Sequence, residues 1–242
     1  MAKPSREYIY GMNPAFEVLR ANRRTVYQAY LNETSRSMPR MKKLVSVLER
    51  REIPIEWVGK ERIRDLSSSK DHQGVVLKSR TYPYVHPEDM LDQPRILLLD
   101  NVEDPNNVGA VLRSAEVFGF HTIFLPRKGC PDIYPSIVKV SSGACEYVSI
   151  AKSHSANAYV RMAKEHGYVV AALDAKGTVT LRELADTKPN RLLLVVGGED
   201  KSVGQFILNG ADHILGIPLH GRINSLNASV AAGIAMHALR EG

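Results

Sequence analysis

Short apolar runs alternate with amphipathic stretches from Arg95 to the end of the chain. The runs predict buried strands at Ile96–Leu99, Thr122–Leu125, Tyr147–Ile150, Tyr168–Ala171, Leu192–Val196 and Ile214–Ile217. Helical spacing of apolar residues fills most of the gaps, near residues 107–118, 155–166, 203–210 and 225–239. Because apolar strands separated by helices are typical of a parallel sheet covered on both faces, we predict an α/β fold with a mainly parallel sheet.

The last predicted helix follows a polar loop around Gly221, which itself follows a strand that runs into Pro218. We expect this helix to begin near Asn224 or Ser225, since both side chains are good N-caps. Behind the cap, the residues that recur every four positions predict the buried face, and these are Leu226, Val230, Ile234 and Ala238. Ligands often bind at such a strand–loop–helix connection, although an ordinary capped connection has the same pattern.

The first 80 residues predict a smaller α/β unit. Asn13 and Pro14 resemble an N-cap and first helical residue. Further helices are expected at about 39–51 and 60–66, and strands at 25–31, 53–58 and 74–77. Residues 79–94 contain three prolines and no periodicity, so they predict a linker. We therefore divide the chain into domains at 1–78 and 95–242, joined by residues 79–94.

Charge is distributed unevenly along the chain. The net charge is +6, yet residues 1–80 hold 17 Lys and Arg against 9 Asp and Glu, which leaves the remainder slightly acidic. This asymmetry favours a polyanionic partner, and nucleic acid is the expected one. A basic surface without a partner is the alternative.

Several classes of protein are disfavoured by the sequence. No apolar run approaches the roughly 20 residues that span a bilayer, and the N-terminal residues lack the apolar core of a secretory signal. Cys130 and Cys145 form neither a disulfide framework nor a metal-ligand spacing. We expect a cytoplasmic protein with no metal and no membrane partner.

Three polar stretches follow predicted strands and are candidates for chemistry. After the strand at 96–99, a helix is expected from Asn106 or Asn107, with Arg113 in its second turn. After the strand at 192–196, the paired glycines Gly197 and Gly198 open room for a ligand, and Glu199 can orient a partner. The third stretch is the loop at 217–227. The glycine fingerprint of dinucleotide-binding proteins, the P-loop and the nucleophile elbow are all absent from the sequence.

Together these three segments resemble the SpoU/TrmH class of RNA ribose 2′-O-methyltransferases, within the SPOUT superfamily. Residues 104–113, 194–199 and 217–231 are similar to that family's three motifs, in the same order. Residues 9–19 and 72–74 resemble the family's L30e-like substrate-binding extension. This layout and residues 141–148 are most similar to the bacterial subgroup that methylates a guanosine ribose in 23S rRNA.

The resemblance implies properties that pattern alone does not give. It implies a C-terminal trefoil knot that forms the S-adenosylmethionine (S-adenosyl-L-methionine) pocket, and a homodimer that completes the active site. By residue match Gly197, Ile217 and Leu226 would line the cofactor, and we add their neighbours Gly198 and Pro218. The family's catalytic or near-catalytic positions are matched by Asn107, Arg113, Glu199, Ser225 and Asn227.

The expected reaction is attack of a ribose 2′-hydroxyl on the methyl group of S-adenosylmethionine. The family gives the residue that matches Arg113 the role of base. Because arginine normally stays charged, we favour a role in which Arg113 binds the adjacent phosphate and stabilises developing negative charge. Asn227 and Glu199 would orient the loop and the ribose, and Ser225 would either cap the helix or bind the ribose. A tRNA ribose methyltransferase and an inactive RNA-binding or ribosome-assembly factor are the alternatives.

Overall fold

The computed structural model describes residues 5–199 and 201–240, which form two compact units. The N-terminal unit contains the described residues up to Pro83 together with Ile133–Glu146. The second unit contains Tyr84–Asp132 and the described residues from Tyr147 onward. Residues 133–146 therefore pack with the N-terminal unit although the chain reaches them only after the second unit has begun.

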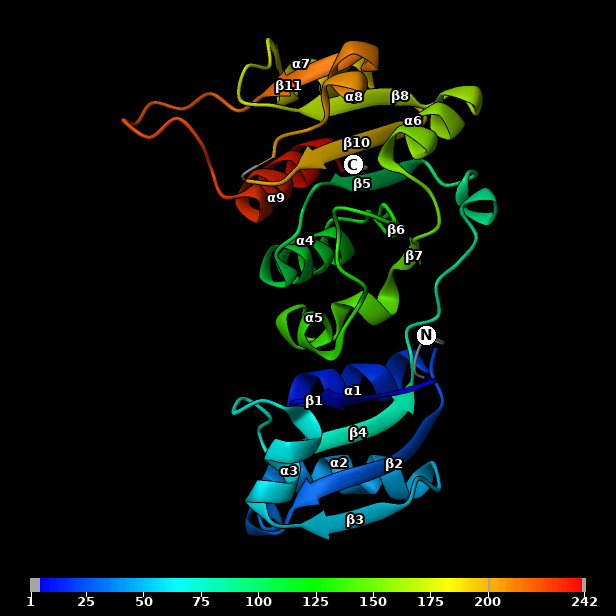
Figure 1. Ribbon diagram of the computed structural model, residues 1–242, viewed down its shortest axis with the longest axis vertical. Helices are drawn as coiled ribbons and strands as arrows, with labels where there is room; N and C mark the ends of the chain where they lie inside the picture. The colour runs from blue at the N-terminus through cyan, green and yellow to red at the C-terminus, as the bar shows by residue number, and fades with distance from the viewer. Residues whose placement is uncertain (1–4, 200, 241–242) are drawn as a thin grey trace. The chain divides into compact units, whose positions relative to one another are not determined.

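The N-terminal unit has a four-stranded sheet in the order β1-β4-β2-β3 (Figure 1). Its strands are β1 (Arg6–Tyr10), β2 (Val26–Asn32), β3 (Ile55–Val58) and β4 (Val75–Arg80). Strand β4 runs antiparallel to β1 and β2, whereas β2 and β3 are parallel. The carboxyl ends of β1, β2 and β3 and the amino end of β4 consequently lie at one edge of the sheet.

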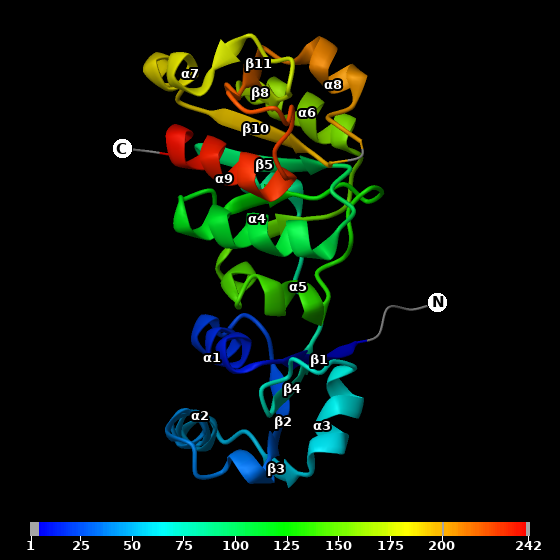
Figure 2. The ribbon, with the colours of Figure 1, turned by 90° about the vertical axis from the view of Figure 1, so that its left-hand side faces the viewer.

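Helices cover both faces of this sheet. Helices α1 (Met12–Ala21) and α2 (Pro39–Arg50) lie on one side, and α3 (Lys60–Ser67) lies on the other (Figure 2). Under α3, Ile63 packs with Tyr10, Tyr30 and Val76. The short helix α5 (Pro135–Val140) belongs to the same unit and packs against β1.

The second unit is built on a seven-stranded parallel sheet in the order β7-β6-β5-β10-β8-β11-β9. The strands are β5 (Arg95–Asp100), β6 (Thr122–Phe124), β7 (Ser149–Ala151), β8 (Val169–Leu173), β9 (Val179–Thr180), β10 (Leu192–Gly197) and β11 (His213–Gly216). The leucine-rich strands β5 and β10 pair at the centre, where Leu97 faces Leu194. A parallel sheet buried on both faces requires such continuous apolar runs, and the α/β prediction is confirmed.

Helices cover both faces of the parallel sheet, as Figure 2 shows. One face carries α6 (Ala156–Glu165) and α8 (Gln205–Gly210), which bury a core around Tyr159, Phe124 and Val195. The opposite face carries α4 (Pro105–Val117), α7 (Leu181–Thr187) and α9 (Ala228–Leu239), with α9 packed against α4, α7 and β10. No helix of the described residues is long and apolar enough to cross a membrane.

Several predicted boundaries differ from the structure. Strand β4 extends to Arg80 and Pro87–Met90 form a 3-10 turn, so the predicted linker at 79–94 is partly ordered secondary structure with buried side chains at Tyr82 and Met90. The elements β1, α5, α7 and β9 were not predicted. Helix α1 is capped by Gly11 and α4 by Asp104, one or more residues before the expected caps.

The start and the buried face of the last helix were both predicted wrongly. Helix α9 begins at Ala228 with Asn227 as N-cap, not at Asn224 or Ser225. None of its buried residues is β-branched, and three of the five are alanine: Ala228, Ala232, Ala235, Met236 and Leu239. By contrast, Val230 is 48% exposed and Ile234 is 41% exposed. The alanines let α9 approach α4 and β10 closely, and the β-branched side chains face outward.

Candidate active site

The carboxyl ends of three neighbouring strands border one cavity in the second unit. Strand β8 ends before Asp174, β10 ends at Gly197, and β11 leads through Gly216 to Ile217. The cavity has a volume of about 270 Å³, and the segment Asn224–Ala228 closes its far side. Clefts at the carboxyl ends of parallel strands are the usual ligand sites of open α/β sheets.

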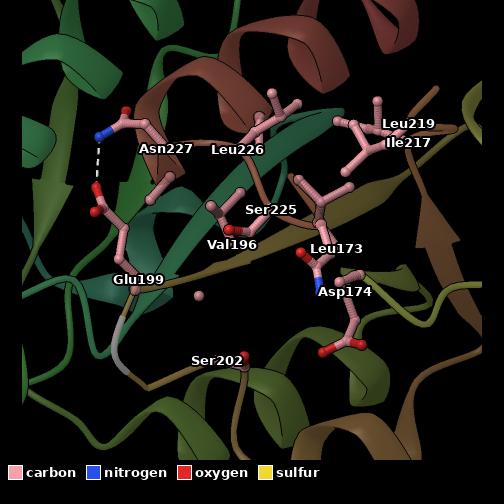
Figure 3. Close-up of a pocket in the computed structure, with 16 residues that line it drawn as sticks. Leu173, Asp174, Val196, Glu199, Ser202, Ile217, Leu219, Ser225, Leu226 and Asn227 are labelled. Atoms are coloured by element: carbon pink, nitrogen blue, oxygen red, sulfur yellow. Dashed lines mark hydrogen bonds between the residues drawn. The ribbon is translucent and has the colours of Figure 1, made fainter. Parts of the chain in front are cut away.

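Apolar side chains form much of the cavity wall. The contributing residues are Leu173, Val196, Ile217, Leu219 and Leu226, which come from the ends of β8 and β10 and from the segment after β11 (Figure 3). An apolar wall with polar groups at its ends suits a flat heterocycle that carries a polar tail. Among the predicted cofactor-binding residues, Gly197, Gly198, Ile217 and Leu226 line this cavity, whereas Pro218 borders a neighbouring hollow with Ile217 and Leu219.

The glycine pair also has a local function in the packing of the protein itself. A Cβ atom on Gly197 would lie 2.4 Å from the backbone nitrogen of Val203, and one on Gly198 would lie 2.1 Å from the carbonyl oxygen of Asn101. Both glycines therefore make room for neighbouring backbone of the protein itself. Side chains at either position would push apart the loops that surround the cavity.

A buried carboxylate also holds the loops that surround the cavity. Asp100, the last residue of β5, is 7% exposed, and its Oδ2 accepts a hydrogen bond of 2.9 Å from the backbone N–H of Gly204. Its carbonyl oxygen accepts a second bond, of 3.1 Å, from the N–H of Gly198. Burial raises the pKa of the Asp100 carboxyl, and the Gly204 bond opposes that shift. Asp100 thus joins the end of β5 to the loop after β10.

Three of the predicted catalytic residues meet at one end of the cavity. The side-chain amide of Asn107 donates a hydrogen bond of 2.8 Å to Glu199 Oε1. The amide of Asn227 donates to the same oxygen (Figure 3) and, at 2.9 Å, to Asn107 Oδ1. One carboxylate therefore connects the first turn of α4, the loop after β10 and the start of α9.

Asn227 has two structural functions at once. Its side-chain oxygen accepts from the backbone N–H groups of Ser229 (2.9 Å) and Val230 (3.3 Å), which caps α9. Its side-chain nitrogen donates to Glu199 and Asn107. The capping function that we considered for Ser225 belongs to Asn227, and Ser225 instead lines the cavity.

Arg113 lies outside the cavity, whereas Asp174, which was not predicted, lies in its wall. Arg113 lies on the exposed side of α4 and has no hydrogen bond or ion pair among the described residues, and it does not line the cavity. Asp174, which the sequence reasoning missed, does line it. The signal was a polar residue directly after an apolar strand, but we ended that strand at Ala171, whereas β8 continues to Leu173.

Comparisons with known proteins agree with this geometry. Residues 94–237 match the model of the SpoU rRNA methylase family, and residues 8–85 match the model for RNA 2′-O ribose methyltransferase substrate binding. A TrmH-family tRNA/rRNA methyltransferase of Bacillus subtilis is 29% identical over 96% of this chain and 94% of its own. A tRNA/rRNA methyltransferase of a Mycobacterium species (strain KMS) is 33% identical over 95% of this chain and 74% of its own.

Solved structures show the same fold. The rRNA methyltransferase of Sinorhizobium meliloti, bound to S-adenosylmethionine, aligns with a TM-score of 0.81 and 22% identity over 97% of this chain and 87% of its own. The SpoU methyltransferase AviRb of Streptomyces viridochromogenes, also bound to S-adenosylmethionine, aligns with a TM-score of 0.78 and 18% identity over 97% and 89%.

The cavity fits S-adenosylmethionine as the cofactor. Its apolar wall can take the adenine ring, and its polar ends can take the ribose and the methionine part. Among the described residues that line it, the charged side chains are Asp174 and Glu199, both acidic, which suits a cofactor with a net positive charge. Motifs, cavity and family models lead to one conclusion: the chain belongs to the SpoU rRNA methylase family of S-adenosylmethionine-dependent RNA methyltransferases.

Proposed function

We propose that this protein methylates the ribose 2′-hydroxyl of a guanosine in 23S rRNA. The observation that carries the 2′-O-transfer proposal is the Asn107–Glu199–Asn227 network beside Ser225, at the end of the cofactor cavity. The motif at 141–148 and the N-terminal unit favour the 23S subgroup. When bound, S-adenosylmethionine supplies an electrophilic methyl group, and the protein must hold a ribose oxygen in line with it.

The network would position the elements that receive the ribose. Glu199 holds Asn107 and Asn227 together, so the start of α4 and the start of α9 keep a fixed separation. Ser225, on the cavity wall, is available to hydrogen-bond the ribose. Such fixed polar groups contribute to rate by orienting the reacting atoms, without motion at the moment of reaction.

Arg113 would bind the RNA phosphate next to the target ribose. Its guanidinium is exposed and unpaired among the described residues, so it is free to form a bidentate contact with a phosphate. We expect Arg113→Ala to lower the rate of methyl transfer by about 100-fold while S-adenosylmethionine binding stays unchanged. Arg113→Lys should recover part of the loss, because it restores the charge without the planar fork. An unchanged rate in Arg113→Ala would exclude this role.

The N-terminal unit would bind the RNA outside the target nucleotide. At the edge where β1, β2 and β3 end, the Arg36 guanidinium lies 4.8 Å from the centroid of the Trp57 ring. Arg40 lies nearby on α2 and bonds Asn13 at 2.6 Å, and Lys60 follows β3. Cations beside an aromatic ring suit RNA, since phosphates pair with the cations and unstacked bases stack on the ring.

A homodimer is the proposed assembly. Val230 and Ile234 of α9 form a shallow hollow with Ala110 and Phe118 beside α4, and the two branched side chains are nearly half exposed. A second copy of the chain would cover this apolar face.

The trefoil knot that the resemblance implies stays a prediction.

Transfer of labelled methyl from S-adenosylmethionine tests the proposed substrate. Purified protein is incubated with unmodified 23S rRNA fragments and, separately, with unmodified tRNA, and the modified nucleotide is mapped. We expect label at one guanosine 2′-oxygen of 23S rRNA. Label in tRNA alone would establish the tRNA alternative, and cofactor binding without label in either RNA would support an inactive RNA-binding factor.

A further inference from the structure

The charged residues that line the cofactor cavity, among those described, all carry negative charge. Of the described residues that line it, Asp174 and Glu199 carry charge, and no Lys, Arg or His is among them. S-adenosylmethionine has a sulfonium and an ammonium group against one carboxylate, so it is a net cation. In a cleft partly shielded from water, the attraction between such a cation and a carboxylate is stronger than in bulk solvent.

The two carboxylates lie apart and differ in their partners. Glu199 lies at the end of the cavity where the amides of Asn107 and Asn227 already donate to it. Asp174 lies on another side, beyond Ser225 and next to Leu173 (Figure 3). Glu199 Oε1 therefore already accepts from two side-chain amides, whereas no side chain of the described residues donates to Asp174, which leaves Asp174 as the less engaged carboxylate.

The position of Asp174 is fixed by its backbone. Its N–H donates to the carbonyl oxygen of Leu215 at 3.0 Å, and its own carbonyl accepts from the N–H of Gly177 at 3.0 Å. Oδ1 accepts from the backbone N–H of Lys176 at 2.8 Å. Oδ2 has no hydrogen-bond partner among the described residues. The turn thus holds one carboxylate oxygen in place and leaves the other open.

We infer that Asp174 is a cofactor-binding residue that recognises the positive charge of S-adenosylmethionine. The inference rests on the family's cofactor and is independent of which RNA is methylated. Since a carboxylate at the end of a parallel strand can also bind ribose hydroxyls, the two contacts must be separated by ligands that share the adenosine part and differ in their cationic groups.

Isothermal titration calorimetry of Asp174→Asn with three ligands makes that separation. Asparagine keeps the oxygen that accepts from Lys176 but removes the charge. S-adenosylmethionine has both cationic groups, S-adenosylhomocysteine keeps only the ammonium, and 5′-methylthioadenosine has neither but retains adenine and ribose. We expect Asp174→Asn to weaken S-adenosylmethionine about tenfold and to leave 5′-methylthioadenosine within about twofold.

The affinity losses of the three ligands distinguish which cationic group Asp174 contacts. A loss for S-adenosylhomocysteine as large as that for S-adenosylmethionine supports a contact with the ammonium, and a loss confined to S-adenosylmethionine supports a contact with the sulfonium. An equal loss for 5′-methylthioadenosine, or no loss for any ligand, would overturn the inference. Asp186→Asn on the exposed side of α7 is the matched control and should bind all three ligands as the wild type does. Because no RNA is present, failure of the 23S proposal would not affect the result.

Discussion

Asn227 is the residue whose two hydrogen-bonding groups can be tested separately. Asn227→Ala removes the cap of α9 and the contact with Glu199, so we expect it to destabilise the fold by about 1 kcal/mol and to slow methyl transfer about 100-fold. Chemical denaturation and methyl-transfer assays measure the two effects.

The matched variant is Asn227→Asp. Aspartate still accepts from the N–H groups of Ser229 and Val230, so the cap is retained, but it places a second carboxylate against Glu199. We expect helix stability closer to that of the wild type together with a loss of activity as large as in Asn227→Ala. Wild-type activity in Asn227→Asp would show that the Glu199 contact has no part in the reaction.

Glu7 is a second residue whose role can be tested, through the pH dependence of folding stability. It shares the Arg24 guanidinium with Glu146, and burial raises the pKa of Glu7 to about 7 from 4.5, against the opposing effect of Arg24. Between these two pH values the folded protein binds more protons than the unfolded chain, so the contribution of Glu7 to stability falls as the pH rises.

The variant Glu7→Gln removes this titration. We expect the stability of Glu7→Gln relative to the wild type to grow as the pH is raised from 4.5 to about 7 and to be constant above and below that interval. Urea denaturation at several pH values measures the difference. A difference that is independent of pH would show that Glu7 titrates as it does in the unfolded chain.

At the scale of the element, α9 shows what periodicity can and cannot predict. The apolar residues of this helix surround much of its circumference, so spacing alone did not distinguish the face toward the sheet from the face toward solvent. The structure buries the alanines and exposes Val230 and Ile234. Side-chain size determined which residues are buried, because close packing on α4 and β10 admits only small side chains over most of that face.

The exposed apolar residues of α9 provide a test of the proposed homodimer. We expect the double variant Val230→Glu and Ile234→Glu to be monomeric, because paired helices would bring the new carboxylates into an apolar contact. Size-exclusion chromatography with light scattering measures the mass. Phe206→Glu is the control, since Phe206 is 56% exposed on α8, which covers the other face of the sheet. A wild-type protein that is already monomeric would contradict the dimer.

The other elements differ in how far their own sequence determines whether they form a helix or a strand. The strands β5, β8 and β10 were predictable because each contains a continuous apolar run. Helix α5 was not, because Ile137, Val138 and Val140 favour a strand, and Pro135 with packing against β1 makes the segment helical. Of the site, the motif positions were identified through family resemblance, whereas the Glu199 network and Asp174 depend on contacts between distant segments.

At the scale of the molecule, a buried ion pair connects segments far apart in the sequence. The Arg24 guanidinium donates to both oxygens of Glu146, at 2.9 and 2.5 Å, and neither side chain is exposed. The Tyr82 hydroxyl bonds the Cys145 carbonyl oxygen at 3.0 Å beside them. Residues 133–146 are thereby anchored in the N-terminal unit by polar contacts as well as by packing.

Removing one member of this pair should be more harmful than removing both. We expect Arg24→Met to destabilise the protein by about 3–5 kcal/mol, because Glu146 is left buried without its partner. Arg24→Met combined with Glu146→Met should recover part of that loss, as measured by urea denaturation, since Glu7 still lacks the guanidinium that it shares in the wild type. The control is Arg20→Met, whose exposed pair with Glu17 should contribute less than about 1 kcal/mol. A double variant no more stable than Arg24→Met would contradict the coupling.

The place of residues 133–146 in the N-terminal unit has a consequence for synthesis on the ribosome. When Pro83 has emerged, the unit still lacks α5 and the buried Glu146 carboxylate that pairs with Arg24, so it cannot complete its core. Translation adds roughly 5–20 residues per second, which delays completion by some seconds. During that interval the nascent chain holds an incomplete unit in which Arg24 lacks one of its two carboxylate partners, and the methyltransferase unit begins to form before the earlier one is finished.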